Sequence, residues 1–321
     1  MRAILASSVL SIALLSTACA AIQPEATAAA SEWTLDRTQL LTDLDVLAAD
    51  DMEGREVGTE GNARARAYII GRLEAMGAAP MGDSFEHDFT FEQRRTGAKV
   101  GGVNILAFIA GTSDSDRTMV VTAHYDHEGM RGGQIWNGAD DNASGVASVL
   151  AVTEMFLAEP PEHDVIIAFV DAEERGLQGA RAFVANPPIP VENITFNLNM
   201  DMVAMSTDRI LWAVGTYHYP FLTTIVEDVA SRATVSMPMG YDEPSQEPGA
   251  DWTNLTDSGA FHAVGIPFIY LGVDYHPHYH QPTDTYENMT LDFFQDASAA
   301  VVDFARQADA RLDAIGEASG R

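Results

Sequence analysis

VIIAFVDAEERGLQGA, residues 165–180, is the stretch that decides the fold class. Its first six residues, VIIAFV, are wholly apolar, which is typical of a strand buried on both faces within a parallel sheet. Carboxylates follow this strand directly, and a short helix is expected over 177–184. Because open α/β sheets bind ligands at the carboxyl ends of their strands, this order predicts a ligand site there.

Apolar runs and helical periodicities alternate through the rest of the chain. Further strands are expected over 103–109, 118–123, 194–202, 210–214 and 266–271, and helices over 35–49, 63–76, 142–158, 221–230 and 291–312. This alternation predicts an α/β fold, with a mostly parallel mixed sheet covered by helices on both faces.

Composition and charge narrow the range of functions. The chain has 321 residues, with 47 acidic and 18 basic side chains and a formal charge of −29. A protein this acidic repels phosphate backbones, so nucleic-acid binding is not expected. The only cysteine, Cys19, excludes a cysteine-based zinc site. A metal would therefore need histidine and carboxylate ligands.

The first residues are typical of a secretory signal. Arg2 precedes an apolar run over 3–15, which is too short to span a bilayer. We therefore expect a signal peptide over 1–20, a flexible tether over 21–31 and a single domain over 32–321.

Two kinds of processing fit this leader. STAC, residues 16–19, is similar to a lipoprotein box, whereas ACA, residues 18–20, fits ordinary signal cleavage. Both lead to export, to the periplasm or the outer surface. Attachment to a membrane is expected only through a lipid on Cys19.

Ionisable residues gather in segments that follow predicted strands or turns. These segments are AHYDH (123–127), GADDNASG (138–145), DAEERGLQGA (171–180), NMDM (199–202) and HPHYHQPTDT (276–285). Converging carboxylates repel one another unless cations hold them together. Imidazoles combined with several carboxylates are a ligand set for two divalent ions, and the nitrogen donors favour zinc.

Two metal ions about 3.5–4 Å apart need a shared anionic ligand. Asp140 and Asp141, in the turn before a predicted helix, are both candidates for this bridge. The N-terminus of that helix also favours a capping side chain. We assign the capping role to Asn142 and not to Asp140.

With two further stretches, these segments resemble the co-catalytic di-zinc exopeptidases of peptidase family M28, which include bacterial leucyl aminopeptidases and glutamate carboxypeptidase. The further stretches are GREVGTEGNARARAYIIGRLEAMG (54–77) and TDSGAFHAVGIPFIYLG (256–272). The resemblance runs from Asp50 to Asn288. It implies a zinc-exopeptidase (phosphorylase/hydrolase-like) architecture, two zinc ions per chain and peptide substrates.

The resemblance also implies a role for each matching residue. The zinc ligands would be His124 and Asp201 for one ion, Glu174 and His280 for the other, and Asp140 as the bridge between them. Glu173 would be the general base. Asp126 and Asp141 would lie outside the ligand set, with Asp126 orienting His124. The family pattern also places a cis peptide bond between Asp140 and Asp141.

The remaining histidines near the motifs are expected to be structural. His276 and His278 would shape the loop that ends in His280. His127 has no partner motif, so we expect it in the core or on the surface.

Substrate contacts are expected from the loop MPMGYDEPSQEPGADW, residues 237–252, which is too long for a plain connector. Tyr241 and Trp252 are its candidate contact residues. Asp257 is a third candidate; it lies in a Thr-Asp-Ser segment where the family often has Ser-Asp-His.

Aminopeptidase activity is the leading prediction, and two enzymatic alternatives stay open. A carboxypeptidase would need a cationic pocket for the substrate carboxylate, and we consider only Arg175 and Arg209 close enough to the motifs to build one. Glutaminyl cyclases of the same fold use one zinc and generally lack the paired aspartates. A binding protein of the transferrin-receptor ectodomain type would have lost the metal ligands, which are retained here together with Glu173. A periplasmic metal-scavenging protein would use the same ligands but would not need Glu173.

Overall fold

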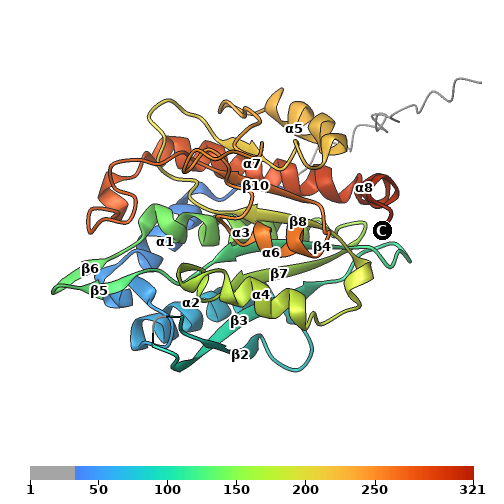
Figure 1. Cartoon of the computed structure of the whole chain (residues 1–321). Coiled ribbons are helices and arrows are strands. Elements are labelled where there is room, and N and C mark those ends of the chain that lie inside the picture. Colours follow the sequence, from blue (N-terminus) through green and yellow to red (C-terminus); the bar gives the residue numbers. More distant parts are fainter. Residues whose placement is uncertain (1–32, 95) are drawn as a thin grey trace, which may run out of the picture.

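The computed structural model describes residues 33–94 and 96–321. The expected signal peptide, the tether and Cys19 lie outside these residues. The centre of the fold is a mixed eight-stranded sheet in the order β1-β3-β7-β4-β8-β10-β9, with β2 paired to β3 (Figure 1). Its strands are β1 (Ala79–Pro80), β2 (Glu86–Glu92), β3 (Lys99–Ile109), β4 (Thr118–His124), β7 (Asp164–Val170), β8 (Ile194–Met200), β9 (Trp212–Val214) and β10 (Phe268–Gly272). A separate two-stranded sheet pairs β5 (Gly129–Arg131) with β6 (Gln134–Trp136).

Strand direction brings the ends of the central strands together. Strands β7, β4, β8 and β10 are parallel neighbours in the middle of the sheet. Strands β3 and β9 run against them. The sheet is therefore mixed and mostly parallel, as expected, and the carboxyl ends of its four central strands lie along one edge.

Helices cover both faces of this sheet. They are α1 (Arg37–Leu47), α2 (Glu60–Met76), α3 (Gly145–Ala158), α4 (Gln178–Ala185), α5 (Thr223–Ala230), α6 (Ser258–Ala263), α7 (Leu291–Asp309) and α8 (Leu312–Ser319). Helices α4 and α6 pack on one face, in front of the sheet in Figure 1, and the others pack on the opposite face.

The alternation of side chains along the buried strands explains how one apolar run serves both faces. In VIIAFV, Ile166 and Ala168 face the layer of α4 and α6, whereas Ile167 and Phe169 face the larger helical layer. A strand that is apolar on both sides is stable only between two such layers.

Most of the expected elements are present, but some bounds differ, and the short elements β1, β5, β6 and α6 were not expected. The helix expected over 291–312 stops at Asp309, and a separate helix begins at Leu312. The strand expected over 194–202 ends at Met200, so Asp201 lies in the turn beyond it. Strand β2, EHDFTFE, was not expected because this edge strand is largely exposed and has a weak apolar signal.

None of the helices in the described part of the chain combines enough length with enough apolar character to cross a bilayer.

Candidate metal centre and active site

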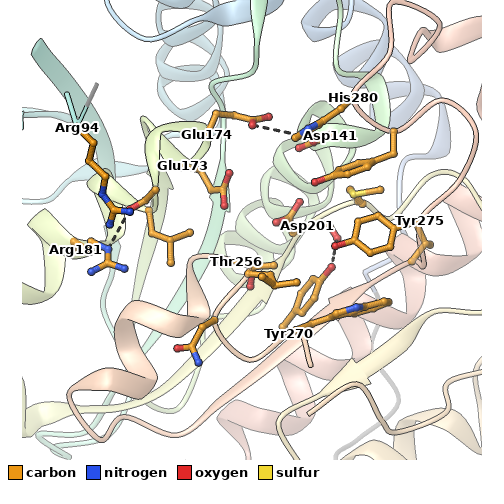
Figure 2. A pocket seen from close by; sticks show the side chains of 18 residues that line it. Arg94, Asp141, Glu173, Glu174, Arg181, Asp201, Thr256, Tyr270, Tyr275 and His280 are labelled. Carbon is orange, nitrogen blue, oxygen red and sulfur yellow. Dashed lines mark hydrogen bonds and ion pairs between the residues drawn. The ribbon is translucent and has the colours of Figure 1, made fainter. Parts of the chain in front are cut away.

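The ionisable segments meet at the carboxyl ends of the central strands. His124 is the last residue of β4, Asp201 follows β8, and Glu173 and Glu174 lie in a short 3-10 helix, Glu173–Arg175, after β7. The loop with His280 follows β10. Glu173, Glu174, Asp201 and His280 line a cavity of about 400 Å³, shown in Figure 2, whereas His124 is buried and does not line it.

A buried arginine fixes the backbone beneath this cavity. The Arg55 side chain is fully buried and donates hydrogen bonds of 2.5–2.9 Å to the carbonyl oxygens of Leu47, Tyr125, Asn137 and Gly138. Burial lowers its pKa to about 10, although the nearby carboxylates of Asp284 and Asp141 oppose this shift. Arg55 therefore stays cationic and joins the loops that place the metal-ligand candidates.

One group of donor atoms centres on His124. Its Nε2 lies 3.2 Å from Asp141 Oδ1 and 3.3 Å from Asp201 Oδ1. On the other side of the ring, Nδ1 lies 3.1 Å from the backbone oxygen of Asp126. A hydrogen bond from Nδ1 fixes the tautomer that leaves Nε2 free to bind a metal.

A second group of donor atoms centres on Glu174. His280 Nε2 lies 3.4 Å from Glu174 Oε2 and 3.0 Å from Asp141 Oδ2. His127 Nδ1 lies 2.8 Å from Glu174 Oε1 and 3.7 Å from the same Oδ2 of Asp141.

Asp141 is the residue shared by the two groups, so the expected bridge at Asp140 is wrong. Asp141 points Oδ1 at the first group and Oδ2 at the second. The Asp140 carboxylate instead accepts hydrogen bonds from Ala204 N at 2.6 Å and Ser144 Oγ at 3.2 Å, and lies 2.9 Å from His276 Nε2. The cis peptide bond joins Asp141 to Asn142, one position later than expected.

The turn itself is held by two further side chains. Asp284 accepts hydrogen bonds from the backbone N–H groups of Asp140 and Asp141 at 2.9 and 3.1 Å. Asn142 accepts one from Gly145 N at 2.9 Å, at the start of α3, and one from Met202 N at 3.1 Å. Asn142 therefore accepts the first N–H of α3, but the N-cap residue itself is Ser144 and not Asn142 as expected. The contacts to Asp284 hold the backbone of both aspartates in the turn.

His127 is a member of the site that the sequence analysis placed elsewhere. Both of its ring nitrogens are buried, and neither has a partner with hydrogen-bond geometry. The only sequence signal was its position in AHYDH, three residues after His124. Tertiary packing turns this ring toward Glu174, which also has an unsatisfied buried oxygen, Oε1.

These residues fit two divalent metal ions. The donor atoms of His124, Asp141 and Asp201 lie within 4.8 Å of one another, and so do those of His127, Asp141 and Glu174. Unsatisfied buried atoms on His127 and Glu174 indicate that a further binding partner belongs between them. Burial and the charge of Asp141 raise the pKa of Glu174, but the neighbouring imidazoles of His127 and His280 bring it down to about 2, so this carboxylate is ionised. Imidazoles and ionised carboxylates are ligands that zinc accepts.

Glu173 differs from its neighbour Glu174 in its surroundings. Its carboxylate lines the cavity and receives no hydrogen bond or ion pair from the described residues. Its backbone N–H donates to Asp126 Oδ1 at 3.0 Å. Burial, with the charges of Glu174 and Asp257, raises the pKa of Glu173 well above its usual value, while His124 opposes the shift. Such a carboxylate is suited to accepting a proton.

Of the expected substrate contacts, only Trp252 lines the cavity. Tyr241 stacks against Trp252 with a ring separation of 3.8 Å, so it supports the wall from behind. Asp257 is fully buried, and both of its carboxylate oxygens lack a hydrogen-bond partner. Burial raises its pKa to about 8. Direct contact of Tyr241 or Asp257 with a substrate in this cavity is therefore not supported.

Comparison with known proteins gives one family and one fold. A model of peptidase family M28 matches residues 104–305. A probable zinc metalloprotease of Pyricularia oryzae is 35% identical over 114 residues, which are 32% of this chain and only 21% of that protein. A leucine aminopeptidase precursor from Bacteroides thetaiotaomicron has a TM-score of 0.68 at 18% identity, over 86% of this chain and 98% of that structure. A glutaminyl cyclase from the same organism has a TM-score of 0.68 at 19% identity, over 85% of this chain and 98% of that structure.

The different positions of Asp140 and Asp141 generate a prediction. Asp141→Asn removes the charge shared by both donor groups, so zinc binding at both should weaken by at least roughly 10–100-fold. Asp140→Asn leaves both groups intact and should retain both metals, while its thermal stability falls because a buried contact with His276 is weakened. Zinc titration and thermal unfolding measure the two effects. Loss of metal in Asp140→Asn alone would restore the original assignment.

The position of His127 generates a second prediction. His127→Ala should weaken one of the two zinc sites by roughly 10–100-fold, because Glu174 loses a neighbouring donor. His278→Ala is the matched control, since His278 contacts Thr283 and no residue of either donor group. Competition with a chromogenic chelator measures both affinities. Unchanged zinc binding in His127→Ala would show that this ring is only part of the core.

Proposed function

The chain belongs to peptidase family M28, and we propose that it is an exported aminopeptidase that removes N-terminal residues from peptides with the help of two zinc ions. One observation supports this most directly. Asp141 lies between two complete donor groups, and the unpaired Glu173 lines the same cavity.

Two sets of residues would hold the ions. They are His124, Asp141 and Asp201 for one, and Asp141, Glu174, His280 and His127 for the other. Zinc bound there would supply Lewis acidity, which activates water and polarises the scissile carbonyl. The first set offers three protein ligands, and catalytic zinc sites usually combine three such ligands with an open position.

Glu173 would move the proton. Its unpaired carboxylate lines the cavity, where it could accept a proton from the attacking water and pass it to the departing amine. Asp126 supports this arrangement from outside, because its backbone oxygen lies beside His124 and its carboxylate accepts the Glu173 N–H. One residue therefore orients both a metal ligand and the base.

The cavity offers an apolar wall for a substrate side chain. Trp252, Leu255, Tyr275 and Tyr279 line it, and Leu255 and Tyr275 are about half exposed at 48% and 51%. Exposed apolar side chains beside a catalytic cavity are suited to a peptide whose first residue is apolar.

A glutaminyl cyclase is the alternative within the same fold. That reaction would need one zinc, whereas two groups of possible ligands share Asp141 in the described residues. The second group favours peptide hydrolysis over cyclisation.

Hydrolysis and metal content together test the proposal. Zinc-loaded protein should contain two zinc ions per chain and release the chromophore from aminoacyl anilides, fastest for apolar residues. A panel of anilides, with elemental analysis of the same sample, makes this measurement. One firmly bound zinc, no anilide hydrolysis and cyclisation of peptides that begin with glutamine would instead establish the cyclase.

Adjacent glutamates offer a matched pair of variants. Glu173→Gln should keep both zinc ions while turnover falls by roughly 10²–10⁴-fold, the usual contribution of a general base. Glu174→Gln should lose affinity for one zinc, with activity partly recovered when zinc is added. If the zinc-rescued variant were Glu173→Gln, the two roles would be exchanged.

Export rests on the leader of the sequence. Mass spectrometry of protein from its native host should find either a lipidated Cys19 or an N-terminus at Ala21. An intact Met1 in that protein would contradict export.

A further inference from the structure

Two arginines in the cavity differ from almost all the others in the described chain. Most arginines of this acidic protein form ion pairs with aspartate or glutamate, and Arg55 and Arg321 donate to backbone carbonyl oxygens. Arg94 and Arg181 are exposed, line the cavity and form no ion pair with any described residue. Their charge is therefore available to a ligand.

The fold brings these arginines to the cavity from separate elements. Arg94 lies in the turn between β2 and β3, which is closed by a hydrogen bond from Gln93 N to Ala98 O. Arg181 lies in α4, and its Nε donates to Gly176 O at 3.1 Å. This contact leaves the two terminal nitrogens of Arg181 free. In Figure 2 both arginines lie on the Glu173 side, with Tyr275 and His280 on the other.

Charge within the cavity also favours an anionic ligand. The lining carboxylates are those of Asp141, Glu173, Glu174 and Asp201. Two divalent ions would balance these four charges. The guanidinium groups of Arg94 and Arg181 would then remain as positive charge without a counterion, in a protein whose formal charge is −29.

The arginines expected to serve a carboxylate pocket are engaged elsewhere. Arg175 pairs with Glu56 at 2.5 Å and Glu128 at 3.5 Å, and Arg209 pairs with Asp296 at 2.6 Å. Sequence analysis overlooked Arg94 because the turn that contains it is distant from every motif.

We propose that Arg94 and Arg181 bind a carboxylate of the peptide substrate. This inference rests on the proposed peptidase function and narrows its substrate class. The preferred substrates are short peptides with an apolar residue against Trp252 and Tyr275 and a carboxylate against the two arginines. That carboxylate is either the C-terminus of a dipeptide or an acidic side chain after the scissile bond. Arginine suits both, because its planar donors match a carboxylate.

The proposed carboxylate site is tested by measuring the equilibrium binding of peptides to zinc-loaded Glu173→Gln protein. This variant should bind intact peptides with little turnover. The first pair of probes is Leu-Leu and its C-terminal amide, which tests the C-terminal carboxylate. The second pair is Leu-Glu-amide and Leu-Gln-amide, which tests an acidic side chain. In at least one pair, calorimetry should find that the charged peptide binds about five- to tenfold more tightly than the neutral one. This is the difference in affinity that one or two partly exposed ion pairs contribute. Added salt should reduce this preference.

Variants identify the source of the preference. Arg94→Gln with Arg181→Gln, in the same background, should bring the affinity ratio of the charged and neutral members close to one. The lysine replacements Arg94→Lys and Arg181→Lys should keep part of it. Arg232→Gln is the matched control for net charge, because Arg232 is in an exposed pair with Asp228 and Asp303 and does not line the cavity.

Each result has a definite meaning. Equal binding of both members of both pairs would overturn the inference, as would a preference that survives in the double glutamine variant. If the preference depends on the arginines but wild-type protein hydrolyses none of the peptides, the carboxylate site stands and the proposed peptidase function fails.

Discussion

Buried negative charge at the carboxyl ends of β4, β7 and β8 is the constraint on which the rest of the structure depends. Asp126, Asp141 and Asp201 are all at least nine-tenths buried, and Glu174 points into the same region. Such charges would cost several kcal/mol each if they were left uncompensated. Histidines contact them, Arg55 lies beneath them, and the donor geometry fits two divalent ions. The fold at this edge is thus stabilised by the same groups that could perform chemistry.

Two pairs of adjacent acidic residues divide structural and chemical roles at this edge. Asp140 is bound to Ala204 and His276, whereas Asp141 faces both donor groups. Glu174 lies between two histidines, whereas Glu173 lines the cavity without a partner. In each pair the chemistry of the side chain is the same, and the direction of the side chain decides its role. Contacts from Asp284 and Asp126 to the local backbone N–H groups set that direction.

The cavity combines surfaces of different chemical character around the proposed metal centre. One wall is aromatic and includes Trp252 and Tyr275, and the other presents Arg94 and Arg181. In the proposed substrate, an apolar side chain would lie against the aromatic wall, the bond to be cleaved at the metal centre and a carboxylate against the arginines. The proposed hydrolysis and the proposed carboxylate preference are therefore consistent with one orientation of the substrate.

Much of the fold and the location of the site follow from the sequence itself. The apolar run VIIAFV and its neighbours predict the parallel sheet, and the positions of His124, Glu174 and Asp201 after strands predict that they meet at one edge. Both predictions depend only on local periodicity and on where each strand ends. Tertiary structure alone decided that Asp141 and not Asp140 is shared, that His127 joins the site, and that Arg94 and Arg181 reach the cavity. The direction of a side chain depends on backbone angles and on contacts with residues far away in the chain, such as the contact of Asp141 with Asp284. The spacing of residues within a motif determines neither the backbone angles nor these distant contacts.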